Sequence, residues 1–199
     1  AGSTLESLQV GAPVKEINLN ANRSLKYLPV AGTSISELVL SPCKQSLEEL
    51  ILTENPNLST IDVQGCDKLV KLTTYGDGNN STGKWDISGL ASLESVNISW
   101  ENTMEEVNLS DCPNLSEVGI RGETETLQIN NCLKLPEEQV KALIDHSKIK
   151  NIYACNLTQI KNLIDVKHAA YYKEYVNLSG CSSLQTLDIS GGDKLKTLI

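Results

Sequence analysis

Six cysteines offer the most obvious chemistry in this 199-residue chain. Thiolates can bind zinc, pair as disulfides or act as nucleophiles, and the spacing of the cysteines helps to separate these roles. No Cys-x-x-Cys pair occurs, and neighbouring cysteines are at least twenty positions apart, at Cys43, Cys66, Cys112, Cys132, Cys155 and Cys181. This spacing predicts buried structural thiols, and disulfides or a metal site are the alternatives.

The other candidate catalytic groups form no recognisable site. His146 and His168 stand near the ends of two expected helices, and neither accompanies a Ser or Cys nucleophile motif. Acidic pairs such as Glu105-Glu106 are too common to indicate a catalytic dyad. The sequence therefore predicts a protein that is not an enzyme and that has no cofactor.

One loop carries a partial calcium-binding pattern. Asp77, Asn79 and Ser81 place oxygen-bearing side chains at alternate positions, as the start of an EF-hand loop does. That pattern also needs a glutamate at its twelfth position, where this chain has Ser88. We therefore expect a solvated loop that binds no metal.

An internal repeat sets the spacing of the cysteines. The pattern Leu-x-x-Leu-x-Leu recurs every eleven residues, as in the units that begin at Leu47 and Leu58. Each Leu-x-Leu alternates as a β-strand does, and Leu-x-x-Leu supplies the bend before it. The strands fall into two alternating series, the first including the strand that ends at Val63 and the second the strand that ends at Leu52. A turn of about 22 residues cannot bury its apolar edge alone, so we expect roughly nine turns to stack into a solenoid.

Two segments carry a family resemblance. Residues 107–120 (VNLSDCPNLSEVGI) and 176–198 (VNLSGCSSLQTLDISGGDKLKTL) resemble leucine-rich repeats, whose pattern is LxxLxLxx(N/C)xxL. The variety with strand-like segments in both halves is similar to leucine-rich repeat proteins of Bacteroides-type bacterial surfaces. The resemblance implies an α/β repeat solenoid, a right-handed horseshoe or arc with a parallel inner sheet and strand-like convex segments. It also implies that the recurring Cys or Asn slot points inward as a ladder.

Two convex helices interrupt the expected strands. A proline followed by acidic residues predicts a helix over about 136–146, which replaces one strand of the second series. Apolar spacing predicts a second helix over about 158–168. Between the helices two strand registers remain open, Ile149-Ile152-Ala154 and Lys150-Ile152.

The repeat extends from one end of the sequence to the other. Residues 1–199 therefore predict a single leucine-rich-repeat domain. A solenoid needs a polar cap at each end, and neither end of the sequence carries an obvious one. We expect a fragment of a longer chain in which flanking domains or caps cover the ends.

Polar residues at the outward positions of the first series form the first candidate binding surface. Its members are Asp62, Asp86, Glu106, Asn108, Gln128 and Tyr175. On an inner parallel sheet they would form a mildly acidic surface suited to a basic or hydroxyl-rich partner. Rows of Asn and Asp can also serve only to keep a sheet soluble, and this alternative stays open.

Larger side chains follow three strands of the second series and form the second candidate binding surface. They are Tyr75, Trp100 and Arg121, each about one turn from the next. Exposed Tyr, Trp and Arg are enriched at binding hot spots, and their rings can stack on sugars. The alternative is that Trp100 only covers the neighbouring loop.

Composition limits the partners. The net charge of −8 argues against affinity for nucleic acid or anionic membranes, and no apolar stretch is long enough for a membrane span. We therefore expect a non-catalytic module that recognises a protein or a glycan on its extended repeat surface, with a structural spacer as the alternative. The resemblance implies an extracellular or bacterial cell-surface setting, whereas buried free thiols would also suit the cytoplasm.

Overall fold

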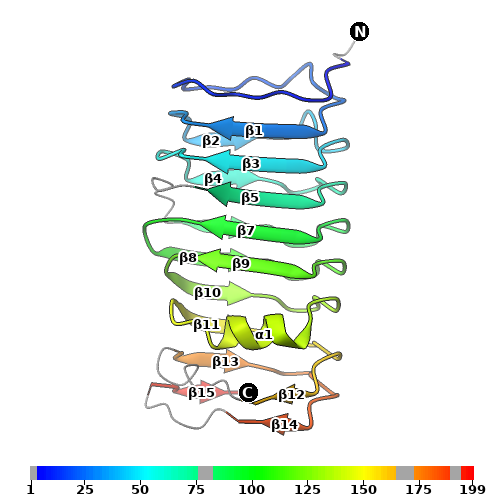
Figure 1. Ribbon diagram of the computed structural model, residues 1–199, viewed down its shortest axis with the longest axis vertical. Coiled ribbons are helices and arrows are strands. Elements are labelled where there is room, and N and C mark those ends of the chain that lie inside the picture. The colour runs from blue at the N-terminus through cyan, green and yellow to red at the C-terminus, as the bar shows by residue number, and fades with distance from the viewer. Residues whose placement is uncertain (1–3, 76–82, 165–172, 189–193) are drawn as a thin grey trace.

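The computed structural model describes residues 4–75, 83–164, 173–188 and 194–199. In these residues the chain forms a parallel β-solenoid of about seven turns. Figure 1 shows the turns stacked along one long axis, with a sheet on each long side. The strands of the nearer sheet run to the left and those of the farther sheet to the right as the chain descends, so the coil is right-handed.

The second series of strands forms the five-stranded sheet. Its strands are β1 (Tyr27–Ala31), β3 (Glu49–Thr53), β5 (Lys71–Tyr75), β7 (Ser95–Ser99) and β9 (Glu117–Arg121). Farther along the same side lies a parallel pair, β12 (Asn162–Leu163) and β14 (Thr186–Leu187).

The first series forms the opposite side. The six-stranded sheet there contains β6 (Lys84–Asp86), β8 (Met104–Asn108), β10 (Thr124–Gln128), β11 (Ile149–Tyr153), β13 (Tyr175–Asn177) and β15 (Thr197–Leu198). A parallel pair, β2 (Glu37–Val39) and β4 (Thr60–Asp62), precedes it.

Aliphatic side chains from the two sides fill a thin core. In the five-stranded sheet the register stacks Leu28, Leu50, Leu72, Val96 and Val118, and all five are buried. Each such side chain stabilises the fold by about 1.5–3 kcal/mol. Layers this thin need no large ring in every turn, which accounts for a core without Phe.

A left-handed residue recurs at one corner of the coil. This residue lies in the turn that follows each of six first-series strands, and its φ is between 60° and 77°. The six residues are Gly65, Gly89, Asp111, Asn131, Asn156 and Gly180. Gly, Asn and Asp are the residues that adopt this conformation most readily. The corner therefore dictates which residue types can stand there.

This corner also resolves the open register. Strand β11 pairs Ile152 with Leu127, and Ile149, Ile152 and Ala154 are all buried, which selects the Ile149-Ile152-Ala154 register. Cys155 consequently precedes the left-handed Asn156, whereas the other five cysteines stand two residues farther along their turns.

The first predicted helix is present as α1 (Glu137–Ile144), and it replaces a strand between β9 and β12 (Figure 1). Its side chains supply the acceptors that the missing strand would have provided. Gln139 Oε1 accepts a hydrogen bond from Val118 N at the edge of β9. Glu137 Oε2 accepts from both Lys161 N (2.6 Å) and Asn162 N (2.8 Å).

The double acceptance by Glu137 repeats a feature of the regular turns. In the five-stranded sheet, the carbonyl oxygen of Glu48 accepts from the two consecutive amides of Val70 and Lys71 in the next turn. The Glu137 carboxylate thus substitutes for one backbone carbonyl. The hydrogen bonds from Asn162 N and Lys161 N, together with Lys141, hold the pKa of Glu137 below its usual value.

The second predicted helix is wrong where the structure describes it. Residues 158–164 contain turns and strand β12, while 165–168 lie outside the described residues. The buried side chains Leu157, Ile160 and Leu163 are spaced by three. The Leu-x-x-Leu bend shares this spacing with one face of a helix, and hydrogen bonding to Glu137 and β14 selects the strand.

The expected horseshoe is not confirmed. Curvature requires layers of unequal width, whereas strands with a spacing of about 4.8 Å line both sides here. The solenoid has about seven turns, fewer than the roughly nine expected. The first turn, for example, joins the next through isolated bridges at Ser7–Tyr27 and Val10–Val30.

No helix among the described residues has the length and apolar character needed to cross a membrane.

Replacing Glu137 by Ala should lower the melting temperature by several degrees, because it leaves two amides at the edge of β12 without their acceptor. Since the folded-state pKa of Glu137 is lowered, its stabilisation is complete above the unfolded pKa of about 4.3 and is lost as the pH falls through the folded value. The difference from the wild type should therefore shrink in acid, as thermal melts followed by circular dichroism would show.

Glu138→Ala is the matched control. Glu138 also begins α1 and pairs with Lys141 at 2.9 Å, but its side chain is 82% exposed and accepts no strand amide in the described structure. An equal loss of stability in both variants would refute the carbonyl-substitution role of Glu137.

Lys173 is a buried cation whose replacement should stabilise the fold. Its Nζ donates to the carbonyl oxygen of His146, and burial lowers the pKa of Lys173 to about 8, although Asp145 acts in the opposite direction. Lys173→Met should raise stability at pH 7 by on the order of 2 kcal/mol. The His146 carbonyl retains the amide of Ile149 as a donor.

The pH dependence separates this effect from improved packing alone. A folded pKa below the unfolded value of about 10.4 destabilises the fold fully below pH 8, and the penalty disappears as the pH rises toward 10.4. The advantage of Lys173→Met in urea denaturation should therefore narrow between pH 7 and pH 9.5. A constant or growing advantage would contradict the assignment.

Candidate functional site

Strand pairing brings the first candidate surface together on the six-stranded sheet. One outward row contains Lys84, Glu106, Thr126, Asn151 and Tyr175. The neighbouring row contains Asp86, Asn108, Gln128, Tyr153 and Asn177. Asp62 ends β4, which lies next to β6. All six residues of this candidate surface therefore lie on one side of the solenoid.

Several Asp and Asn residues of this surface close the turn after their own strand. Asp62, Asp86 and Asn108 each accept, through Oδ1, a hydrogen bond from the backbone amide two residues later, at 3.2, 3.2 and 3.0 Å. Asn177 does the same at 2.9 Å. This Asx-turn favours Asp or Asn for a local structural reason. These side chains are consequently engaged in the fold before any ligand arrives.

The row changes character at Gln128 and Tyr153, whose side chains cannot form an Asx-turn. Gln128 Nε2 donates to Glu106 Oε1 at 2.7 Å, and Lys84 Nζ pairs with Glu106 Oε2 at 3.2 Å. Glu106 is thus held between a cation and an amide. The centre of this sheet carries a hydrogen-bonded cluster instead of turn-closing residues.

Beside this cluster stand two tyrosines, Tyr153 and Tyr175. Their ring centroids lie 4.8 Å apart with an angle of 35° between the planes, within the range of favourable aromatic pairs. Both side chains are half-buried, and Asn177 Nδ2 donates to the Tyr175 hydroxyl at 3.1 Å. Burial, reinforced by Tyr175, raises the pKa of Tyr153.

Sequence reasoning missed Tyr153 because the register around it was open. The signal that would have placed it is the left-handed corner residue. Asn156 corresponds to Asn131 and Gly180 in the neighbouring turns, and this correspondence puts Tyr153 in the row of Asn108.

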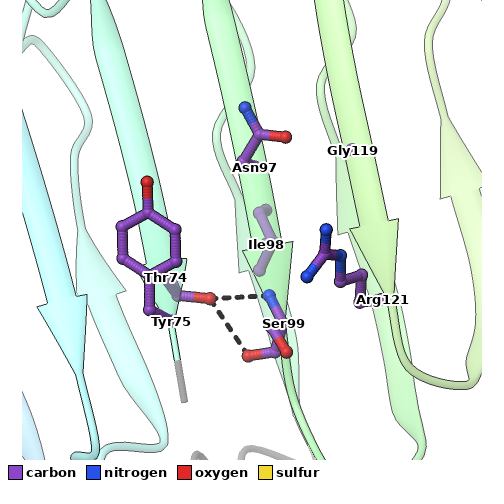
Figure 2. A pocket seen from close by; sticks show the side chains of 7 residues that line it. All are labelled: Thr74, Tyr75, Asn97, Ile98, Ser99, Gly119 and Arg121. Carbon is purple, nitrogen blue, oxygen red and sulfur yellow. Dashed lines mark hydrogen bonds between the residues drawn. The ribbon is translucent and has the colours of Figure 1, made fainter.

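The second candidate surface lies at the end of the five-stranded sheet. Tyr75 and Arg121 lie on either side of Ser99 and line a hollow of about 300 Å³ (Figure 2). Tyr75 is 52% exposed, Arg121 is also exposed, and Arg121 forms no ion pair with any described residue. The structure therefore brings two of the three predicted residues together.

Trp100 does not offer the exposed ring that was expected, since only 5% of it is accessible. Its Nε1 donates to the carbonyl oxygen of Glu123 at 2.8 Å. The ring lies over Gly122, where an added Cβ would come within 2.4 Å of Nε1. A glycine one turn later thus gives the indole a buried site and removes it from the exposed surface.

Two residues that depart from the regular strand pattern, Thr74 and Gly119, shape the hollow. Thr74 stands where neighbouring strands have aliphatic residues, and its Oγ1 accepts from Ser99 N (2.7 Å) and donates to Ser99 O (3.0 Å), as Figure 2 shows. Gly119 leaves space for Asn97, whose Oδ1 would lie 2.2 Å from a Cβ at that position. The Asn97 amide donates to Ser95 Oγ and Glu117 Oε1.

All six cysteines are unpaired, and five Sγ atoms donate to backbone carbonyl oxygens at 3.1–3.9 Å. Burial raises the pKa of Cys66 and Cys132 to about 12 and that of Cys112 to about 11. Cys43 is equally buried, whereas Cys155 and Cys181 are half-buried. Within the described ranges no cluster of His, Cys, Asp and Glu could hold a metal ion.

The remaining sequence candidates lie elsewhere. Asp77, Asn79, Ser81 and His168 are outside the described residues. His146 follows α1, and its Nδ1 accepts from Lys148 N at 3.2 Å. This contact gives His146 a role in closing a turn.

Comparison with known proteins identifies no relative: no protein-family model matches the chain, and no curated protein or solved structure matches it significantly.

The environment of the thiols predicts their reactivity. With Ellman's reagent at pH 8, Cys43, Cys66, Cys112 and Cys132 should react only as fast as the protein unfolds, because they are buried and protonated. Cys155 and Cys181 should react first. Rapid modification of any of the four in native protein, measured by mass spectrometry of labelled peptides, would contradict this.

Proposed function

We propose that this chain is a non-catalytic recognition module that binds a protein partner on its six-stranded sheet. The observation that carries the proposal is the Tyr153–Tyr175 pair beside the Lys84–Glu106–Gln128 cluster. Tyrosine contributes large contact area at a small entropic cost and is enriched at binding hot spots. Gln128 and Tyr153 are also the positions at which the neighbouring row departs from the turn-closing Asp and Asn.

The regular register of the sheet supports a protein as the ligand. The register holds the outward side chains in rows across neighbouring strands, so a partner can contact several turns at once. Glu106 and Lys84 follow on the next two strands beyond Gln128, which is the partner of Tyr153, so both signs of charge lie on the same surface as the tyrosines. A glycan that stacks on the tyrosines is the alternative ligand.

We further propose that the solenoid is a leucine-rich repeat of the cysteine-ladder type with an extracellular or bacterial cell-surface location. The Leu-x-x-Leu-x-Leu pattern supports the family, as do the thiol contacts with backbone carbonyls of the coil. The location rests on the resemblance alone. A cytoplasmic location is the alternative, which the six unpaired cysteines favour.

A structural spacer is the second candidate function. It is favoured by the internal satisfaction of many surface groups, such as the Glu106 carboxylate and the Asx-turn residues. A spacer would tolerate replacement of the tyrosines, whereas a recognition module would not.

Binding should depend on the tyrosine pair. Arrays of surface proteins and of glycans, probed with the labelled chain, should reveal a ligand whose affinity falls at least tenfold in the double variant Tyr153→Ala/Tyr175→Ala. Such a loss corresponds to about 1.4 kcal/mol, a modest value for two hot-spot residues.

The control is Tyr27→Ala, since Tyr27 is a 38% exposed tyrosine on the opposite sheet. It should leave the affinity unchanged, and circular dichroism should show that every variant is folded. A glycan as the dependent ligand would select the alternative. No binding on either array, or a ligand whose affinity is unchanged in the double variant, would favour the spacer.

A further inference from the structure

The hollow beside Tyr75 continues around the corner of the solenoid. A second hollow, of about 370 Å³, shares Ser99 and Arg121 with it and extends to His146 and Lys148. The two together are called the corner groove below. Arg121 stands at their junction, so it faces both.

Among the described residues, the charge that lines the corner groove is opposite to that of the whole chain. The chain carries a net charge of −8, yet no described Asp or Glu lines either hollow, while Arg121 and Lys148 are both exposed there. Two flanking carboxylates outside the lining accept hydrogen bonds, Glu117 from Ser95 Oγ at 3.0 Å and Glu123 from Thr103 Oγ1 at 3.1 Å. The groove is therefore suited to an anionic ligand.

An aromatic ring and fixed polar groups accompany this charge. Tyr75 and Arg121 belong to strands on either side of β7, and two strand spacings, about 10 Å, are the least that separates their backbones, because the pairing of β5 with β7 ends at Thr73. A ring-shaped ligand fits between them, with one face on Tyr75. Asn97, whose Oδ1 lies over Gly119, adds a hydrogen-bond acceptor for a sugar hydroxyl to the lining.

We propose that the corner groove binds an acidic saccharide, that is, a sugar chain that carries carboxylate or sulfate groups. Arg121 would form the bidentate pair that guanidinium groups make with such anions. Tyr75 would stack on the neighbouring ring, and Lys148 would meet the next acidic group along the chain. A long polyanion such as nucleic acid is disfavoured, because most of the surface would repel it.

This site is independent of the proposed recognition surface. Tyr153 and Tyr175 lie on the six-stranded sheet, whereas Tyr75 and Arg121 belong to the five-stranded sheet. Either surface can fail its test without affecting the other.

The test is a calorimetric and NMR titration of the chain with oligogalacturonate and chondroitin sulfate fragments, against neutral cello-oligosaccharides of the same length. The wild type should bind at least one acidic saccharide at millimolar concentration or below and should not bind the neutral one. Arg121→Gln should weaken binding at least tenfold, and Lys148→Gln and Tyr75→Ala should each weaken it severalfold.

Arg23→Gln and Tyr27→Ala are the matched controls, because Arg23 and Tyr27 are also exposed but lie outside the corner groove. Both should bind as the wild type does. The proposal is overturned if no acidic saccharide binds, if the neutral sugar binds as well, or if Arg23→Gln weakens binding as much as Arg121→Gln. Tighter binding of an acidic peptide or of single-stranded DNA in the same groove would also overturn it.

Discussion

Every turn of this protein depends on its neighbours for backbone hydrogen bonds, and this requirement governs the rest of the structure. A single turn has unpaired amides and carbonyls on both edges, and its apolar side chains lie open above and below. Parallel, in-register stacking satisfies both needs at once, as in the paired layers of Leu50 and Leu72. Because the register is strict, each position in a turn meets its counterpart in the next. A structural demand at one corner therefore recurs along the chain.

Helix α1 shows how strong this requirement is. A helix satisfies its own backbone and leaves the two flanking strands without a partner. Gln139 and Glu137 restore acceptors to these strands, and one carboxylate oxygen of Glu137 takes two amides as a strand carbonyl does. The interruption is tolerated because side chains reproduce the pattern of the missing strand. The edges of the stack thus constrain which side chains the helix can carry.

Periodicity predicted the solenoid, both series of strands and α1, since these depend on spacing along the chain. It could not separate a Leu-x-x-Leu bend from a helix at Leu157 and Ile160, where hydrogen bonds from neighbouring turns decide. Nor could it show that Trp100 is buried, because that depends on Gly122 one turn away. The spacing placed the first-series candidates on one sheet, but Tyr153 was missed until the corner at Asn156 set the register.

The same repetition offers a way to separate functional from structural residues, because the turns of one chain can be compared with one another. Where Asp or Asn recurs at one position, as at Asp86 and Asn108, an Asx-turn explains the residue without any ligand. Where the row breaks, as at Tyr153, the local structure no longer requires the side chain that is present. At Gly119 the departure is the loss of a side chain, and the missing Cβ makes room for Asn97 in the hollow beside Arg121. These two departures lie on opposite sheets, and in neither does the repeat itself dictate the residue that is present, which is why the two proposed binding surfaces are built on them.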